Sequence, residues 1–410
     1  MTISTLVKLH LIVYADDVIL LAQDYHALQR MFDMLQSSFA SIGLQFDPDK
    51  TAWLSLEGPT PGGDGVPSFV ESMTWLGILW QKGDYNFDST AKRRQQFAQA
   101  AQYELVGDVV AAQLLGNLPS CRVVWMAMVQ AHLITMGPAW GMQHFKVQRA
   151  WRHAGMQMLA RYLRKVLGLS RHVSNIALAL EAGLWPPVVL VARRVNDMWA
   201  AAQDSDNVLL RAAAQCETAL CEQGSKCWLR MWLTAFQCEL ADIKAGHLAD
   251  KVAAACVGQV EAYCTAPIHE DKCAERHIAM YVQQFAHVTP IGKVPRHHSK
   301  FKLPWRVLHQ YINIATGNVK LPAYDAGYGI PFTARHCPLC EPNKVCTVYH
   351  LLSDCSFMQL DTLDDDDGEY TPDRSGASMQ QWLQNNYSAD GIRFLVAAVS
   401  RFQREAAWYT

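Results

Sequence analysis

The stretch at residues 11–21 constrains the fold of this chain more than any other. Two apolar, partly β-branched runs flank a small residue and the adjacent carboxylates Asp16 and Asp17. This pattern predicts a tight β-hairpin with buried arms and an acidic tip. Carboxylates held at the end of such a hairpin suit Mg²⁺, although alternation along a strand lets only one of them aim fully at a common ion. An ordinary acidic surface turn is the alternative.

Further motifs follow the hairpin in a fixed order. Asp24 precedes an amphipathic helical pattern that ends at Gly43, and residues 43–51 read Gly-Leu-Gln-Phe-Asp-Pro-Asp-Lys-Thr. After a Gly- and Pro-rich loop, Thr74-Trp75-Leu76-Gly77 lies within a strand predicted at about residues 72–80. Together with Tyr14-Ala15-Asp16-Asp17, these segments resemble palm motifs C, D and E of reverse transcriptases of the non-LTR retrotransposon (long-interspersed-element) type.

This resemblance implies an RNA-directed DNA polymerase, a nucleotidyltransferase that uses Mg²⁺, an RNA template and a DNA primer. It implies that Asp16 is the main Mg²⁺ ligand, that Asp17 is its weaker neighbour and that Lys50 assists the leaving group. It also implies a primer grip formed by Trp75, Leu76 and Gly77. The family more often has Asn at the position of Asp47, and Tyr or Phe at that of Trp75.

The same family uses a third aspartate and a fingers region that precede the hairpin. Residues 1–10 contain no carboxylate and are too few to form fingers. The chain therefore resembles the C-terminal portion of such an enzyme. We expect it to be inactive alone, to need the missing N-terminal half as a partner, and to present an incomplete sheet with an exposed apolar edge.

Composition narrows the class of protein. With 410 residues, 50% of them hydrophobic and 18% charged, the chain is long enough for several globular domains. A net charge of -2 gives no overall sign of a nucleic-acid partner, so binding would depend on local patches. Twelve cysteines without a signal peptide or an apolar run of membrane length predict reduced thiols. We expect an intracellular protein, nuclear or cytoplasmic, with no membrane partner.

The predicted fold class is α+β. Strands and helices are expected in residues 1–88, and the pattern becomes helical for more than two hundred residues after Asp88 and Ser89. Residues 1–88 are assigned to a partial palm of hairpin and helices, and residues 89–200 to a helical thumb. A helical connector with a basic patch follows at 201–325, a zinc knuckle at 326–360, and an acidic loop and C-terminal helix at 361–410.

Two groups of cations in the predicted thumb are candidates for phosphate contacts. Arg93 and Arg94 lie near the start of a helix that Asp88 or Ser89 can cap, where positive charge opposes the helix dipole. Their presence there suggests a use other than helix stability. Arg161, Arg164 and Lys165 can share one helix face and meet several phosphates. Ordinary solvated faces are the alternative in both cases.

Residues 293–306 form the densest basic patch. Basic groups interleaved with aromatic rings suit a single-stranded nucleic acid, because bases stack while phosphates meet cations. A charged, proline-containing linker is the alternative. The candidate binding residues are Lys300, Lys302, Trp305 and Arg306.

Cys337, Cys340, His350 and Cys355 form a C-x2-C-x9-H-x4-C pattern. Two closely spaced cysteines, a histidine and a third cysteine can converge on a tetrahedral Zn²⁺, and four protein ligands make such a site structural. A rival set contains Cys346 in place of Cys355, and a chance cluster of thiols is a third possibility. The pattern resembles the knuckle that follows the thumb in this retroelement family, which favours Cys355.

Three functional hypotheses follow from the sequence. The chain is a reverse-transcriptase fragment that is inactive alone, a non-catalytic RNA- or DNA-binding module, or the product of a decayed element without a selected role. The acidic run at residues 364–367 is expected to be a solvated loop rather than a metal site.

Overall fold

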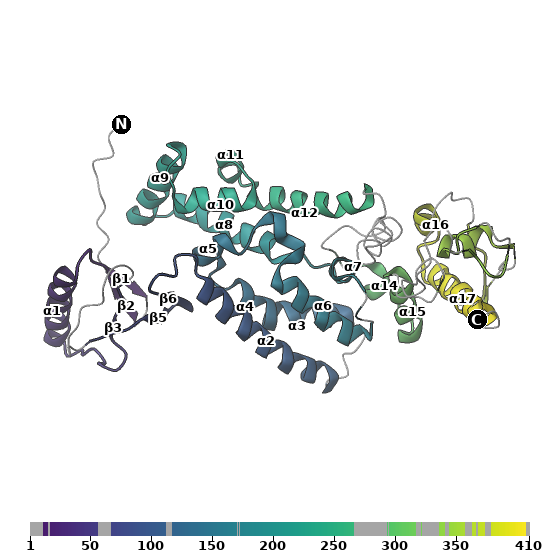
Figure 1. The fold of residues 1–410 in the computed structure, drawn as a ribbon, viewed down its shortest axis with the longest axis horizontal. Coiled ribbons are helices and arrows are strands. Elements are labelled where there is room, and N and C mark those ends of the chain that lie inside the picture. Colours follow the sequence, from purple (N-terminus) through teal and green to yellow (C-terminus); the bar gives the residue numbers. More distant parts are fainter. Residues whose placement is uncertain are drawn as a thin grey trace.

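The computed structural model describes residues 11–14, 17–55, 67–111, 117–169, 171, 173–265, 293, 295–316, 321, 336–340, 344–356, 363–365, 368–373 and 379–406. Within these ranges the protein is mostly helical and carries small two-stranded sheets, so it belongs broadly to the α+β class. Figure 1 shows the N-terminal strands and α1 at one end, a helical body in the centre and α14–α17 at the other end.

The N-terminal part contains the predicted hairpin. Strands β1 (Leu11–Tyr14) and β2 (Asp17–Leu20) pair antiparallel, with Leu11 opposite Leu20 and Tyr14 opposite Asp17. Helix α1 (Tyr25–Ser41) starts at Asp24, whose carboxylate accepts a hydrogen bond from the Ala27 N–H at 2.8 Å. Short parallel strands β3 (Ala52–Trp53) and β4 (Ser68–Phe69) follow.

This part buries little apolar surface. Phe32 is the buried residue of α1, whereas Val13 is 59% and Met34 72% exposed. Strands β1 and β2 pair only with each other among the described strands. The sheet is therefore small, and the β1 side chains Leu11 and Val13 face solvent.

The strand predicted at residues 72–80 is instead a second hairpin. Strands β5 (Ser72–Trp75) and β6 (Ile78–Gln81) pair antiparallel around a two-residue turn formed by Leu76 and Gly77. Both turn residues have positive φ, 48° at Leu76 and 77° at Gly77, which is the backbone of a tight hairpin turn. A continuous apolar run hid this turn, because only the glycine marks it in the sequence.

Helix α2 (Asp88–Ala111) holds this second hairpin against the helical body. The Thr90 hydroxyl donates to Leu79 O and accepts from Leu79 N–H, both at 2.9 Å. The buried Arg94 guanidinium donates to Gly77 O at 2.6 Å. The Asp84 carboxylate accepts from the N–H groups of the first helical residues, so Asp84 caps α2 rather than Asp88 or Ser89.

Replacing Gly77 with alanine is expected to loosen this hairpin. A Cβ there would lie 1.9 Å from Arg94 Nη2, and the positive φ adds about 1–2 kcal/mol of strain. Hydrogen exchange of the Leu79 amide measures the loss. Gly83→Ala is the matched control, because Gly83 has a φ of 78° with nothing within 4 Å of its Cβ position. Equal losses of protection in both variants would contradict a role for the Arg94 contact.

The remaining helices of the body form one continuous core in the centre of Figure 1. Their bounds are α3 (Leu118–Trp125), η1 (Met126–Gln130), α4 (Ala131–Ile134), α5 (Gly137–Trp140), η2 (Gly141–Gln143), η3 (Val147–Arg152), α6 (Ala154–Leu167), α7 (Asn175–Glu181), α8 (Pro187–Gln203), α9 (Val208–Glu222), α10 (Trp228–Phe236), α11 (Leu240–Lys244) and α12 (Leu248–Thr265).

Tryptophan side chains join helices that are distant in sequence. The indole N–H groups of Trp228 and Trp232 both donate to Pro138 O at 2.9 Å, which joins α10 to α5. Trp151 donates to Cys256 O at 3.0 Å and so joins η3 to α12. These polar ends are satisfied while the rings supply buried area to the core.

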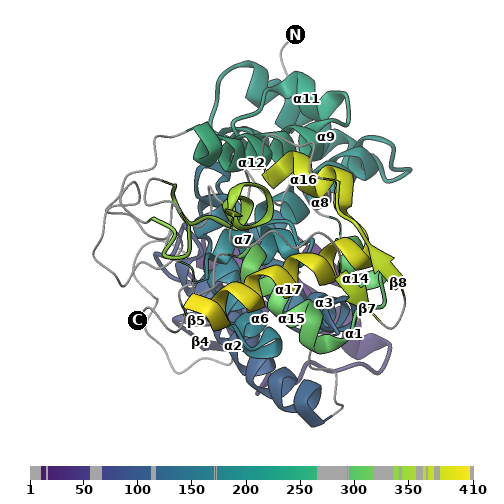
Figure 2. The ribbon, with the colours of Figure 1, turned by 90° about the vertical axis from the view of Figure 1, so that its right-hand side faces the viewer.

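The C-terminal part contains α14 (Arg296–Ser299), α15 (Trp305–Ala315), η7 (His350–Asp354), β7 (Leu363–Asp365), β8 (Gly368–Tyr370), α16 (Met379–Asn386) and α17 (Ala389–Ala406). Helix α17 contacts both α15 and η7, and Figure 2 shows it lying across this end of the molecule. Strands β7 and β8 pair antiparallel, so Asp364 and Asp365 lie in a strand rather than in the expected loop. Among the described helices, none is long and apolar enough to cross a membrane.

Candidate metal centre and nucleic-acid interface

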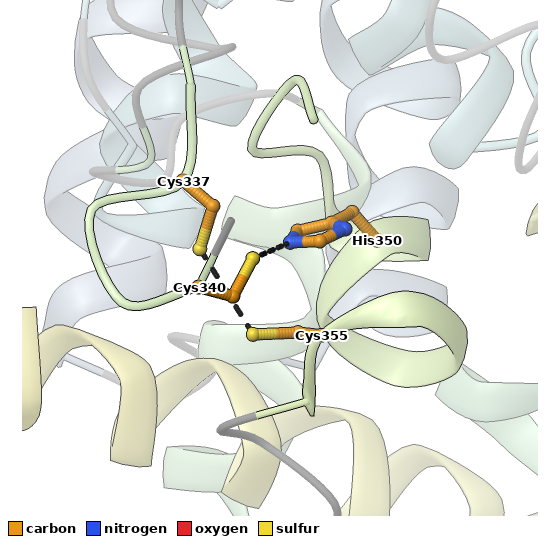
Figure 3. A group of neighbouring side chains, drawn as sticks. All are labelled: Cys337, Cys340, His350 and Cys355. Carbon is orange, nitrogen blue, oxygen red and sulfur yellow. Dashed lines mark hydrogen bonds between the residues drawn. The ribbon is translucent and has the colours of Figure 1, made fainter. Parts of the chain in front are cut away.

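Four side chains near the C-terminal end converge on one point. The Sγ atoms of Cys337, Cys340 and Cys355 and a ring nitrogen of His350 all lie within 4.8 Å of one another. Cys337 Sγ lies 3.9 Å from Cys355 Sγ, and Cys340 Sγ lies 3.1 Å from His350 Nε2. Figure 3 shows the first two cysteines on one loop facing His350 and Cys355 on a helical turn. This group could hold a metal ion.

Local backbone structure brings the four side chains together. His336 and Val345 form an antiparallel bridge, and Cys337 N–H donates to Lys344 O at 2.9 Å, which closes the loop that carries the first two cysteines. His350 and Cys355 flank the π-helical turn η7, in which Cys355 N–H donates to His350 O at 2.8 Å.

The π-turn explains the x4 spacing of the last two ligands. In an α-helix, residues five apart differ by about 140° in direction, which would separate the two side chains. The wider turn brings position i+5 back above position i, so both ligands face the cysteine loop.

Cys346 lies beside this group but outside the set of four. It is fully buried, and its thiol is hydrogen-bonded to Cys337. That hydrogen bond lowers the pKa of the Cys337 thiol well below its usual range. The group of four that could hold a metal contains Cys355 and not Cys346, which lies beside Cys337 instead.

Of the two carboxylates of the first hairpin, only Asp17 lies within the described residues. Asp17 begins β2 and is exposed, whereas Asp16 lies outside the described residues. Among the described residues, the groups that could hold a metal do not include Asp17. Lys50 is 85% exposed and forms an ion pair with Asp47 at 3.4 Å in the turn after α1. The predicted Mg²⁺ site at Asp16 and Asp17 therefore stays a prediction.

The two arginines at the start of α2 hold the β5–β6 hairpin. Arg94 is buried against Gly77, and Arg93 donates to the Thr74 hydroxyl and lies over the Phe97 ring at 5.4 Å. Both cations therefore have partners within the protein and fasten the hairpin to α2. The turn proposed as a primer grip, from Trp75 to Gly77, lies directly against them.

Two of the three predicted cations on α6 face solvent. Arg161 and Lys165 are exposed one turn apart. Arg164 is half-buried, and its guanidinium donates to Val173 O and to Asn175 Oδ1. This leaves Arg161 and Lys165 as the accessible pair on this face.

The basic patch divides into exposed and buried members. Trp305 is 42% exposed, and three cations beside it are exposed as well: Lys300, Lys302 and Arg306. By contrast, the rings of His297 and His298 are turned into the core. These four exposed side chains are accessible to a nucleic acid.

A surface cavity that sequence reasoning missed lies between η2, η3 and α10. Its volume is about 530 Å³, and Lys146, Arg149, Lys226 and Arg230 line it without any carboxylate among the described lining residues. The cations come from two distant stretches of the chain, and neither stretch is strongly basic by itself. Only the folded arrangement concentrates them, which makes the cavity a candidate anion site.

No protein-family model, curated protein or solved structure matches this chain.

Proposed function

We propose that this chain is the portion of a non-LTR retrotransposon reverse transcriptase that runs from the palm hairpin to the zinc knuckle, and that it binds nucleic acid. The main support for this proposal is the group of Cys337, Cys340, His350 and Cys355, which converge on one point C-terminal to the helical body. The ordered palm motifs support it from the sequence side.

Zinc is the ion that suits the C-terminal cluster. Three thiol sulfurs and one imidazole nitrogen are a common structural donor set for Zn²⁺, and Zn–S bonds of 2.3 Å place tetrahedral sulfurs about 3.8 Å apart. Cys337 Sγ and Cys355 Sγ lie 3.9 Å apart. With four protein ligands, the ion would join the cysteine loop to η7 and to the adjoining α17, and it would have no catalytic role.

Nucleic-acid binding is supported by cations that face solvent at separate places on the molecule. They lie on α6, at the start of α15 and around the basic cavity. Phosphate contacts of this kind supply affinity without sequence specificity and make binding strongly dependent on salt. This distribution allows a chain with a net charge of -2 to bind a polyanion locally.

Removing two cations of the basic cavity is expected to weaken binding. In the Arg149→Ala/Arg230→Ala variant, the slope of log affinity against log salt for a single-stranded RNA should fall by about 0.7 per lost phosphate contact. Fluorescence anisotropy across a salt series measures this slope. Lys244→Ala is the control, because Lys244 already pairs with Glu222 at 2.8 Å. An unchanged slope in the double variant would exclude the cavity from the interface.

Polymerisation is expected to require more than this chain. Leu11 and Val13 expose apolar surface on β1. This exposure supports the proposal that a further palm strand, which carries the third carboxylate, belongs beside the hairpin. Primer extension on a homopolymer RNA template with Mg²⁺ should give no product, while template–primer is retained in a salt-sensitive way. Extension by the chain that is abolished by Asp16→Ala/Asp17→Ala would show that its own carboxylates complete the site.

A further inference from the structure

A second cluster of buried ligand-type side chains lies outside the knuckle. Glu181, the last residue of α7, meets His297 and His298 of α14. Glu181 Oε1 lies 2.5 Å from His297 Nε2 and 2.7 Å from His298 Nε2. The three side chains are 2%, 3% and 0% exposed, so the cluster is sealed from solvent.

Two consecutive histidines on one helical turn do not normally face the same point. Successive residues of a helix differ by about 100° in direction. Here the rings of His297 and His298 lie with their centroids 4.4 Å apart, and both direct Nε2 at the same carboxylate oxygen. The turn begins at the buried Pro295, whose carbonyl accepts from His298 N–H at 3.1 Å. The backbone is thus shaped to bring both rings inward.

The chemistry of the three side chains suits a cation. One carboxylate oxygen and two imidazole nitrogens converge here, and all of them lie within 4.8 Å of one another. A buried carboxylate is stabilised by a positive group beside it. A divalent cation held by these three donors would supply that charge.

A third segment fixes the orientation of one ring. The Tyr387 hydroxyl lies 2.7 Å from His297 Nδ1, which leaves Nε2 directed at Glu181. The buried Tyr311 ring packs edge-on against His297 at 4.7 Å. Partners on the second nitrogen of a histidine are typical of metal-ligating imidazoles, because they set the ring orientation and the tautomer.

We propose that Glu181, His297 and His298 form a second metal site, distinct from the cysteine cluster, which takes Zn²⁺ through two imidazole nitrogens and one carboxylate oxygen. Zinc accepts this donor set in proteins. The ion would fasten α14 to α7 and, through Tyr387, the C-terminal helices to the body. The exposed cations Lys300, Lys302 and Arg306 of the basic patch follow α14 directly, so the site would also fix their position.

Metal content of the purified full chain tests this proposal. We expect two equivalents of zinc in the wild type, one in Glu181→Gln and one in Cys337→Ser/Cys340→Ser. Glutamine keeps the size of the side chain and a carbonyl acceptor but removes the charge. One equivalent in the wild type, lost in the cysteine variant and unchanged in Glu181→Gln, would overturn the proposal. The three side chains would then be joined by their hydrogen bonds alone.

Cobalt substitution distinguishes the two sites in the intact chain, so the test does not depend on whether a variant folds. Co²⁺ in the cysteine cluster gives intense thiolate-to-metal charge-transfer bands, whereas Co²⁺ bound by oxygen and nitrogen gives only weak visible bands. We expect a second equivalent of Co²⁺ to add weak bands without further thiolate absorption. Saturation at one equivalent with thiolate bands alone would exclude the second site.

Discussion

Replacement of both Cys337 and Cys340 by serine is expected to release zinc and to unfold residues 336–356. Structural zinc contributes about 10–16 kcal/mol in isolated zinc-finger peptides, because the ligand arrangement does not persist in the unfolded chain. Hydrogen exchange at the Cys355 amide, which donates to His350 O at 2.8 Å, should change from protected to fast. Chelation of the wild-type protein should have the same effect, and acid should mimic it because thiolate ligands must lose protons to bind.

Single serine variants separate the two possible ligand sets. Cys355→Ser should lose the zinc of the cysteine cluster, whereas Cys346→Ser should keep it, because Cys346 lies beside Cys337 without belonging to the group of four. Cys216→Ser is the neutral control, since Cys216 is exposed on α9. Retention of zinc in Cys355→Ser together with its loss in Cys346→Ser would reverse the ligand assignment.

The sequence predicted local elements well wherever one residue marks a boundary. Asp24 starts α1 as an N-cap, and the apolar runs around Asp16 and Asp17 form β1 and β2. The same reasoning missed the β5–β6 turn, because Leu76 adopts a positive φ inside an apolar run. It also gave the cap of α2 to the wrong residues, because the capping carboxylate of Asp84 reaches the helix from the preceding turn.

Sites, like local elements, could be predicted only where neighbouring residues in the sequence define them. The cysteine cluster was predictable because its four ligands lie within a short stretch with a recognisable spacing. The basic cavity and the Glu181–His297–His298 cluster were not, because each joins segments that only the tertiary fold brings together. Arg94 illustrates the opposite problem. The sequence identifies it as a cation, but it does not show that Arg94 is buried and already donates to Gly77 O.

Replacing Trp232 with alanine is expected to destabilise the helical body by about 3–5 kcal/mol, the usual loss for a buried tryptophan. Trp232 is fully buried, stacks on Phe236 at 4.8 Å and donates to Pro138 O. Such a loss is a large part of the 5–15 kcal/mol typical of folded proteins. A lower urea midpoint at unchanged slope, followed by circular dichroism, measures it.

Trp232→Phe separates ring burial from the hydrogen bond. Pro138 O keeps the Trp228 indole as a donor at 2.9 Å, so no buried acceptor is left unpaired and we expect a smaller cost than for alanine. The neighbouring residues Met231 and Thr234 line the basic cavity. Trp232→Ala should therefore also weaken RNA binding, while Trp232→Phe should preserve it. Equal destabilisation by both variants would mean that the indole N–H, rather than the packed ring, holds α10 against α5.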